Sequence, residues 1–370
     1  MKRLLGSLLF LAAPTALAAP PAEPPAEVRT DERPVLDVVF ALDTTGSMGG
    51  LLEGAKQKVW SIASRMASGK PTPRVRVGLV AYRDVGDAYV TQVYPLSEDL
   101  DAVYKTLRSF RADGGGDTPE AVQDALADAV DKMPWSQARR AAKMVFLVGD
   151  APAHDQDRQK LLQASRRAIA RGIVVNTIRC GADGATETQF REVARLADGR
   201  FDTIEQGGGV VAVATPFDDE LSRLNGALMD TALYAGTRTV QAAGEARRLE
   251  AKAMAPSAAA DRVSYLAKGG GSASGAAAVG ALDLAATPEK AASLKDDELP
   301  PALQKLKVEE RVAYARQQQA RRTQLEQDIA AVSKKRDGYL SAHAAESKDA
   351  FDGRVFEAVK AGAARAGVAY

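Results

Sequence analysis

Acidic and hydroxyl side chains occur at alternate positions near the start of the chain, in the stretch DTTGS. Asp43, Thr45 and Ser47 follow an apolar run and precede two glycines. In an extended turn, alternate side chains can face the same way, so their oxygens could converge on one point. Gly46 lets the backbone bend there. This spacing fits a site for a hard cation, a catalytic aspartate or a helix cap, and the rest of the chain must decide between them.

Two further loops offer oxygen ligands of the same kind. Asp117 and Thr118 lie in the glycine-rich loop GGGDTPE, and Asp150 follows the apolar run KMVFLVG. An all-oxygen set suits Mg²⁺, Mn²⁺ or Ca²⁺ and is poor for zinc or copper. The chain has only 2 histidines and 1 cysteine, which excludes a soft-metal cluster. We expect Mg²⁺ before Mn²⁺ or Ca²⁺, because Mg²⁺ keeps waters and leaves a position open to a partner.

Strand-like apolar runs alternate with segments of helical spacing over residues 35–235. The predicted strands are Val35–Leu42, Val75–Tyr82, Ala88–Leu96, Lys143–Val148, Gly172–Arg179 and Arg200–Ile204. The predicted helices are Gly49–Ala67, Leu100–Phe110, one with Pro119 in its first turn, Arg158–Arg171, Thr186–Ala197 and Val210–Tyr234. This alternation predicts a Rossmann-like, doubly wound α/β fold with a mostly parallel sheet and one antiparallel hairpin between Val75 and Leu96.

The predicted sheet positions the oxygen ligands. In open α/β sheets, ligands gather at the carboxyl ends of the strands. Asp43 follows the first predicted strand, Asp150 follows a later one, and the glycine-rich loop runs into the helix at Pro119. We therefore expect all three loops at the same rim of the sheet.

Together these loops resemble a von Willebrand factor type A (VWA) domain with a metal-ion-dependent adhesion site. The resemblance rests on Asp43-x-Thr45-x-Ser47, Tyr82-Arg83-Asp84, Gly114 to Glu120 and Asp150 to His154, in that order. It spans about Val35 to Asn225 and is closest to the exported bacterial branch of the family. The resemblance implies a VWA fold that carries one divalent cation, to which a protein partner donates an acidic oxygen.

This sequence departs from the usual family pattern at two positions. The first motif usually has serine where this chain has Thr45, which keeps the hydroxyl and adds a methyl group. The second ligand is usually a threonine, whereas this chain offers both Asp117 and Thr118. If Asp117 binds directly, the site holds the cation more tightly but attracts an acidic partner less. Both residues therefore stay candidates.

Simple helix capping is the structural alternative for the same residues. Thr45 or Ser47 could cap the first helix, and Asp117 or Thr118 could cap the one at Pro119. Capping leaves Asp43 without a role, so the cation site is the better interpretation.

Neighbouring residues have ordinary structural explanations. We expect Arg83, Asp84 and Asp87 to form surface ion pairs and His154 to order its own loop. Cys180 lies in a strand-like segment, where it is expected to be a small buried side chain. None of these residues is needed for the cation site.

A haloacid-dehalogenase-like phosphotransferase is the alternative from the enzyme class. Its nucleophile would be Asp43, and Gly149-Asp150 with Asp155 is similar to the later acids of that superfamily. Its phosphatases usually need a second aspartate as general acid two residues after the nucleophile, where this chain has Thr45. We therefore expect a protein that is not an enzyme.

The N-terminal residues have the composition of a targeting segment. Residues 1–18 show the charged, apolar and small-residue parts of a secretory signal peptide, and residues 19–34 form a proline-rich linker. The apolar run is too short to span a bilayer, and no later stretch approaches the roughly 20 apolar residues that spanning needs. We expect an exported protein, periplasmic or secreted, without an integral membrane segment.

The C-terminal third differs in composition from the predicted VWA domain, residues 35–235. Residues 236–298 are rich in Ala and Gly and are expected to be partly flexible, and residues 299–370 are expected to be helical. Arg322 and Arg336 interrupt a coiled-coil seam formed by Leu325, Ile329, Val332 and Tyr339. The final amphipathic stretch contains Phe351, Val355, Phe356 and Val359.

Overall charge limits the class of partner. The 370 residues include 49 Lys and Arg against 48 Asp and Glu, a formal net charge of +1. The overall charge therefore provides no electrostatic attraction for nucleic acid or an anionic membrane. We predict a non-enzymatic binding module whose cation bridges to a carboxylate on a protein partner. The predicted ligands are Asp43, Thr45, Ser47, Asp117 or Thr118, and Asp150. A scaffold whose helical tail carries the interaction is a further alternative, and the oligomeric state is unknown.

Overall fold

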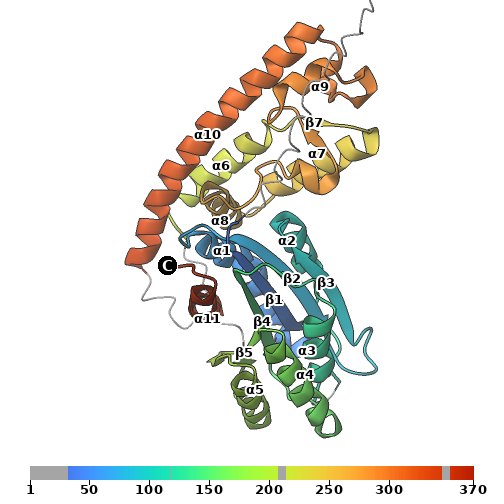
Figure 1. Cartoon of the computed structure of the whole chain (residues 1–370), viewed down its shortest axis with the longest axis vertical. Coiled ribbons are helices and arrows are strands. Elements are labelled where there is room, and N and C mark those ends of the chain that lie inside the picture. The colour runs from blue at the N-terminus through green and yellow to red at the C-terminus, as the bar shows by residue number, and fades with distance from the viewer. Residues whose placement is uncertain (1–31, 117, 207–213, 344–350) are drawn as a thin grey trace, which may run out of the picture. The chain divides into compact units, whose positions relative to one another are not determined.

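A mixed sheet with helices on both faces organises the first part of the chain (Figure 1). The computed structural model describes residues 32–116, 118–206, 214–343 and 351–370. In these ranges six strands form one sheet in the order β3-β2-β1-β4-β5-β6. They are β1 (Val35–Asp43), β2 (Arg74–Tyr82), β3 (Thr91–Ser97), β4 (Ala141–Gly149), β5 (Ile173–Cys180) and β6 (Phe201–Ile204). Neighbours run parallel except β2 and β3, so the predicted sheet and its hairpin are confirmed.

Strand β1 is apolar because it is covered on both faces and lies between two parallel neighbours. All nine of its residues are buried. Its last residue, Asp43, is in register with Tyr82 at the end of β2, and Leu42 is in register with Val148 of β4. The carboxyl ends of β1, β2 and β4 therefore lie at one rim of the sheet.

Alternate residues of β1 point to two separate helical layers, as the two-residue period of a strand requires. Val38 and Phe40 pack in the cluster that includes α1 (Gly49–Ala67) and α2 (Leu100–Ser109). Val39 and Ala41 pack in the cluster on the other face. The helices of that face are α3 (Val122–Asp131), α4 (Arg158–Ala170) and α5 (Gly184–Leu196).

The predicted helix start at Pro119 is wrong. Helix α3 begins at Val122, and its N-cap is Ala121. The backbone N–H of Glu120 donates to the carbonyl oxygen of Pro152 at 2.9 Å, and Glu120 forms a parallel bridge with Ala153. Because this pairing holds the backbone in a strand-like conformation, the first helical turn forms only after it.

Helix α6 (Asp218–Met229) is shorter than the predicted helix Val210–Tyr234. The first four residues of the predicted helix, 210–213, lie outside the described residues. At the other end the chain turns after Met229 and forms the short strand β7 (Tyr234–Ala235). This strand pairs with β8 (Leu282–Asp283), which explains why the helix does not continue to Tyr234.

Residues 236–298, predicted to be partly flexible, contain two helices: α7 (Arg238–Lys252) and α8 (Pro256–Ala267). Glycines here allow close packing against aromatic rings. A Cβ atom added to Gly244 would lie 2.3 Å from the ring of Tyr234, and one added to Gly270 would lie 2.3 Å from the ring of Tyr265. The Ala- and Gly-rich composition therefore reflects tight contacts.

The helical C-terminal region is confirmed, with α9 (Pro301–Gln304), α10 (Val308–Ala342) and α11 (Phe351–Arg365). The interrupted seam of α10 packs against its own chain: Ile329 and Val332 contact the apolar cluster of α6 and α8. None of the helices in the described ranges has both the length and the apolar composition needed to cross a membrane.

The arginines that interrupt the seam form buried ion pairs. The Arg336 Nε atom lies 2.7 Å from Asp218 Oδ1 of α6, and its Nη1 atom lies 2.6 Å from Asp261 Oδ1 of α8. Arg322 Nη1 lies 2.7 Å from Asp283 Oδ2 of β8. Both arginines therefore fix α10 to the preceding helices and strands.

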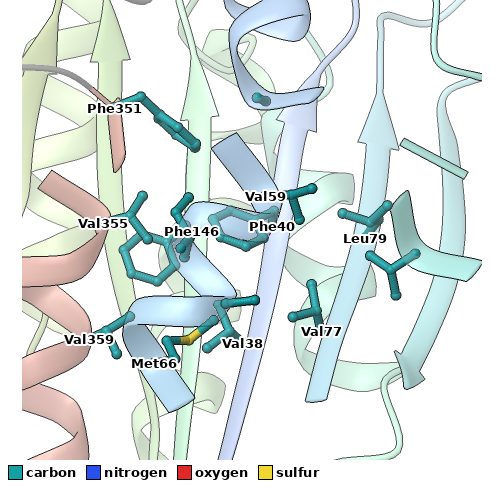
Figure 2. Packing of buried hydrophobic residues seen from close by; sticks show 14 of the residues in the cluster. Val38, Phe40, Val59, Met66, Val77, Leu79, Phe146, Phe351, Val355 and Val359 are labelled. Carbon is teal, nitrogen blue, oxygen red and sulfur yellow. The ribbon is translucent and has the colours of Figure 1, made fainter. Parts of the chain in front are cut away.

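Helix α11 packs directly on the sheet (Figure 2). Phe351 lies 6.1 Å from Phe40 of β1 between ring centroids, and Phe40 stacks on Phe146 of β4 at 5.4 Å. Val355 and Val359, one and two turns further on, join the same cluster. This core therefore contains residues from both sides of the predicted domain boundary at residue 235.

The buried pairs of Arg336 predict a large effect on stability. Replacing Arg336 by Ala leaves Asp218 and Asp261 buried without their cation, and we expect the free energy of unfolding to fall by about 3–5 kcal/mol. Urea denaturation followed by circular dichroism measures this loss. Arg321→Ala, at an exposed position of the same helix, is the control and should change stability by less than about 0.5 kcal/mol. Equal losses in the two variants would contradict the interpretation.

Candidate metal centre

Backbone hydrogen bonds join the loops at the carboxyl rim of the sheet. Gly46 N–H donates to the carbonyl oxygen of Gly114 at 3.2 Å, and Asp113 N–H donates to that of Thr44 at 3.1 Å. These bonds connect the loop after β1 with the glycine-rich loop. The glycine-rich loop ends beside the loop after β4, through the bond from Glu120 to Pro152 described above. The loops thus meet where the strand order places them.

Asp43 is the most constrained side chain at this rim. It is 0% exposed, and its Oδ1 atom accepts hydrogen bonds from the Thr45 backbone N–H at 2.9 Å and the Thr45 hydroxyl at 2.6 Å. Its Oδ2 atom is buried and has no hydrogen-bond partner. Burial raises the pKa of Asp43 to about 7, and the nearby charge of Asp150 adds to this rise. A buried carboxylate oxygen without a partner is costly, so this position requires a proton or a cation.

Asp150 supplies the second carboxylate, from the loop after β4. Its Oδ2 atom accepts a hydrogen bond of 2.5 Å from Gln206 Nε2. Gly149 brings the backbone close to Asp43, because a Cβ atom added there would lie 2.2 Å from the Tyr82 hydroxyl and 3.2 Å from Asp43 Oδ2. The sequence analysis missed Gln206, although its place just after β6, at the same rim, is a usable signal.

Two hydroxyl groups lie beside Asp43. The oxygens of Thr45 Oγ1 and Ser47 Oγ are 3.3 Å apart, Thr45 is buried and Ser47 is exposed. Neither hydroxyl caps a helix: the 3₁₀ turn Gly46–Met48 and helix α1 have no side-chain cap. The capping explanation is therefore wrong for Thr45 and Ser47, because the Thr45 hydroxyl is directed to Asp43 instead.

The second predicted ligand position is only partly described. Thr118 is exposed, and it does not cap α3, whose N-cap is Ala121 without a side-chain hydrogen bond. Asp117 lies outside the described residues. The choice between Asp117 and Thr118 as ligand stays a prediction.

Glu120 is a third acidic residue at the rim that sequence reasoning treated as an ordinary first-turn residue. It is 3% exposed, and its Oε2 atom has no hydrogen-bond partner. Burial raises the pKa of Glu120 to about 8, and the charges of Asp43, Asp84, Asp87 and Asp150 contribute to the rise. Its alternation with Thr118 in an extended segment is the signal that could have identified it.

In the β2–β3 loop, where surface ion pairs were predicted, the Arg83 Nη1 atom lies 3.8 Å from Oδ2 of the exposed Asp113, but the other contacts of these charged residues lie within the loops. Arg83 is buried: its Nη2 atom donates to the carbonyl oxygen of Arg111 at 2.9 Å, and its guanidinium lies 4.6 Å from the ring centroid of Tyr89. Asp87 Oδ2 accepts from the backbone N–H groups of Asp84 and Gly115, both at 3.1 Å. Burial within the loop cluster explains why these groups turn inward.

His154 contacts a neighbouring loop, whereas the sequence analysis predicted that it orders its own. Its Nε2 atom lies 2.7 Å from Asp84 Oδ1. The imidazole is thereby used to tie the loop after β4 to the loop after β2. Cys180 is fully buried as predicted, and burial raises the pKa of its thiol well above the usual value.

The donor set fits a hard divalent cation. The unpaired oxygen of Asp43, the carboxylate of Asp150 and the hydroxyls of Thr45 and Ser47 are all oxygen ligands, which Mg²⁺, Mn²⁺ and Ca²⁺ prefer. Among the residues that the structure describes, no three Asp, Glu, His or Cys side chains come close enough together to hold a metal by themselves. A cation here would depend on the hydroxyls and on water, as Mg²⁺ commonly does.

A family comparison covers this part of the chain. Residues 37–206 match the model of the von Willebrand factor type A domain. The putative ariadne-like RING finger protein R811 of Acanthamoeba polyphaga mimivirus is 28% identical over 124 residues, 34% of this chain and 12% of that protein. The von Willebrand factor A domain-containing protein 7 of Homo sapiens is 34% identical over 104 residues, 28% of this chain and 11% of that protein. The chain thus spans about a tenth of the length of these relatives.

Solved structures with similar chain paths include three proteins of different kinds. The SpRpn10 VWA domain is 15% identical with a TM-score of 0.37, over 47% of this chain and 89% of that one. Proximal thread matrix protein 1 from the mussel byssus, with a zinc-occupied MIDAS motif, is 16% identical with a TM-score of 0.37. The match covers 47% of this chain and 42% of that one. The pilus adhesin SpaC from Lactobacillus rhamnosus GG is 15% identical with a TM-score of 0.36. The match covers 47% of this chain and 28% of that one.

The phosphotransferase alternative gains nothing from these observations. The family match includes both Asp43 and Asp150. The hydroxyl at Thr45, where a phosphatase of that class needs a general acid, is hydrogen-bonded to Asp43 itself.

Proposed function

Residues 37–206 of this chain are a von Willebrand factor type A domain, and from this premise we propose that the protein is an exported module that binds its partner through a divalent cation. VWA domains are generally non-enzymatic modules that bind proteins. The observation that carries the proposal is the buried Asp43 carboxylate, whose Oδ2 atom has no partner beside a second carboxylate and two hydroxyls.

The residues of the rim have distinct roles in this proposal. Asp43, Thr45, Ser47 and Asp150 would hold the cation, and Thr118 or Asp117 would complete the protein's share of ligands. Bound there, the cation supplies a concentrated positive charge in place of the missing hydrogen bond. Asp43 and Thr45 are buried while Ser47 and Thr118 are exposed, so the solvent side of the site lies toward the two exposed residues.

Charge balance supports a carboxylate as the partner's contribution. When Thr118 rather than Asp117 completes the ligands, the two acids in direct contact with the ion, Asp43 and Asp150, balance its charge, and a carboxylate from the partner fills the open position. Val85, 69% exposed in the β2–β3 loop next to this rim, offers an apolar contact for the surroundings of that carboxylate. We propose a protein partner, since the net charge of +1 favours neither nucleic acid nor an anionic membrane.

Removing the buried carboxylate should weaken cation binding. Isothermal titration of Mg²⁺, Mn²⁺ and Ca²⁺ into the chelator-treated full chain is expected to give a single-site isotherm, and Asp43→Ala should weaken the binding at least tenfold, because the ion loses a direct charged ligand. Asp297→Ala removes an exposed carboxylate outside the rim and should bind as the unmodified chain does. Equal and negligible heats in all three proteins would end the cation hypothesis.

Partner capture should depend on the same ion. We expect the immobilised chain to retain specific proteins from a bacterial envelope extract in the presence of Mg²⁺, and to release them when a chelator is added. Asp43→Ala should retain none of them, and Asp297→Ala should retain all. Capture that survives both chelation and Asp43→Ala would contradict cation-mediated binding and would favour the helical C-terminal region as the binding surface.

Export is proposed from the signal-like residues 1–18. Expression of the full chain in a bacterial host should give a periplasmic or secreted product whose N-terminal residue is Ala19, and deletion of residues 2–18 should leave the protein in the cytoplasm. Cell fractionation followed by N-terminal sequencing measures both outcomes. A full-length product in the cytoplasm that still begins at Met1 would contradict export.

A further inference from the structure

The candidate site has a buried acid that the proposed ligand set does not use. Glu120 is 3% exposed, and its Oε2 atom is buried without a hydrogen-bond partner. A buried polar atom of this kind costs free energy unless another group satisfies it. The Oε2 atom of Glu120 therefore needs a ligand or a water molecule that donates a hydrogen bond to it.

The backbone fixes Glu120 at this position. Its N–H donates to the carbonyl oxygen of Pro152 at 2.9 Å, and the next N–H, of Ala121, donates to the carbonyl oxygen of Arg83 at 3.2 Å. Its bridge partner Ala153 is held in turn by Gln189 of α5, with hydrogen bonds of 2.9 and 3.1 Å. The segment cannot move outward without breaking contacts to two other loops.

The side chain of Glu120 lies on the carbon side of Thr45, next to the glycine-rich loop. A Cβ atom added to Gly115 would lie 3.1 Å from Glu120 Oε1 and 2.8 Å from Thr45 Cβ, so the two side chains lie against the same small space. Gly115 keeps that space free, and its φ of +73° is one that glycine adopts readily. The Glu120 carboxylate thus lies beside Thr45, itself bonded to Asp43.

We propose that Glu120 is an additional acid of the cation site that positions water on the bound ion. This inference rests on the proposed function. Among the described residues, Asp43, Asp150 and Glu120 do not form a three-acid metal cluster. We therefore place Glu120, which faces the carbon atoms of Thr45, outside the direct ligands, where its carboxylate accepts hydrogen bonds from water held by the ion. Acids in this outer position commonly change metal affinity by about 10- to 100-fold. Mg²⁺ depends on them most, because it retains more of its water than Ca²⁺ does.

Comparison of two variants that replace a carboxyl group by an amide tests the role of Glu120. Titration of Mg²⁺ and Ca²⁺ into chelator-treated full chain is measured by calorimetry for the unmodified protein, Glu120→Gln and Asp113→Asn. Asp113 is the matched control, because it lies in the same loop region and its side chain is 81% exposed. We expect Glu120→Gln to weaken Mg²⁺ binding at least tenfold and Ca²⁺ binding less, with Asp113→Asn within twofold of the unmodified protein.

The melting temperature of the chelated proteins separates this role from a structural one. A positioning role predicts that Glu120→Gln keeps or raises this temperature while the affinity falls, and that Glu120→Asp recovers part of the Mg²⁺ affinity. Unchanged affinity in Glu120→Gln, or equal weakening of Mg²⁺ and Ca²⁺ together with a lower melting temperature, overturns the inference but leaves the cation site intact. Absence of any cation binding by the unmodified protein overturns the proposed function and this inference together.

Discussion

The arrangement of the rim follows from one electrostatic constraint: a carboxylate stands at the end of a strand that is buried on every side. Asp43 has apolar neighbours along β1, a second acid close by in Asp150, and hydrogen bonds to only one of its two oxygens. Water cannot solvate it, and the raised pKa records that cost. Neighbouring loops supply hydroxyl and carboxylate oxygens at this point, whereas Arg83, which follows the register partner of Asp43 at the end of β2, contacts Arg111 and Tyr89.

A second constraint joins the C-terminal helices to the sheet. Several arginine side chains of the helices after residue 235 are largely buried, and each pairs with an acid from another element. Arg262 of α8, for example, donates from Nε to Asp101 of α2 at 2.7 Å and from Nη1 to Asn225 of α6 at 2.8 Å. Removing one member of such a set leaves a buried charge unpaired, so these contacts specify one arrangement of helices.

Much of the fold was predictable because its signals are local. Apolar runs identify the strands, and the rule that ligands lie at the carboxyl ends of parallel strands identifies the rim with Asp43 and Asp150. The errors have a common origin in contacts between distant segments. Pairing with Ala153 delays the helix expected at Pro119, and pairing of β7 with β8 ends the helix expected to reach Tyr234.

The same limit explains the site residues that were missed or misjudged. Glu120 and Gln206 belong to the rim only because loops far apart in the chain meet there, and their residue types carry no motif. Arg83 and Asp84 are charged and near a turn, which favours a surface location, yet both are buried by the loops above them. Local patterns indicate which residues are able to bind a cation. Burial determines which of them carry a free-energy cost unless a cation or a proton satisfies them.

The position of α11 determines how this protein can be divided into fragments. Phe351 and Val355 cover Phe40 and Phe146 on one face of the sheet, and the last residues continue this attachment, with Ala369 bridged to Lys70 and the Tyr370 hydroxyl donating to the carbonyl oxygen of Met66 at 2.8 Å. A fragment that ended at residue 235 would expose these aromatic rings to water and would be prone to aggregate. A tag fused to Tyr370 would therefore lie directly beside these contacts of the last residues with Lys70 and Met66.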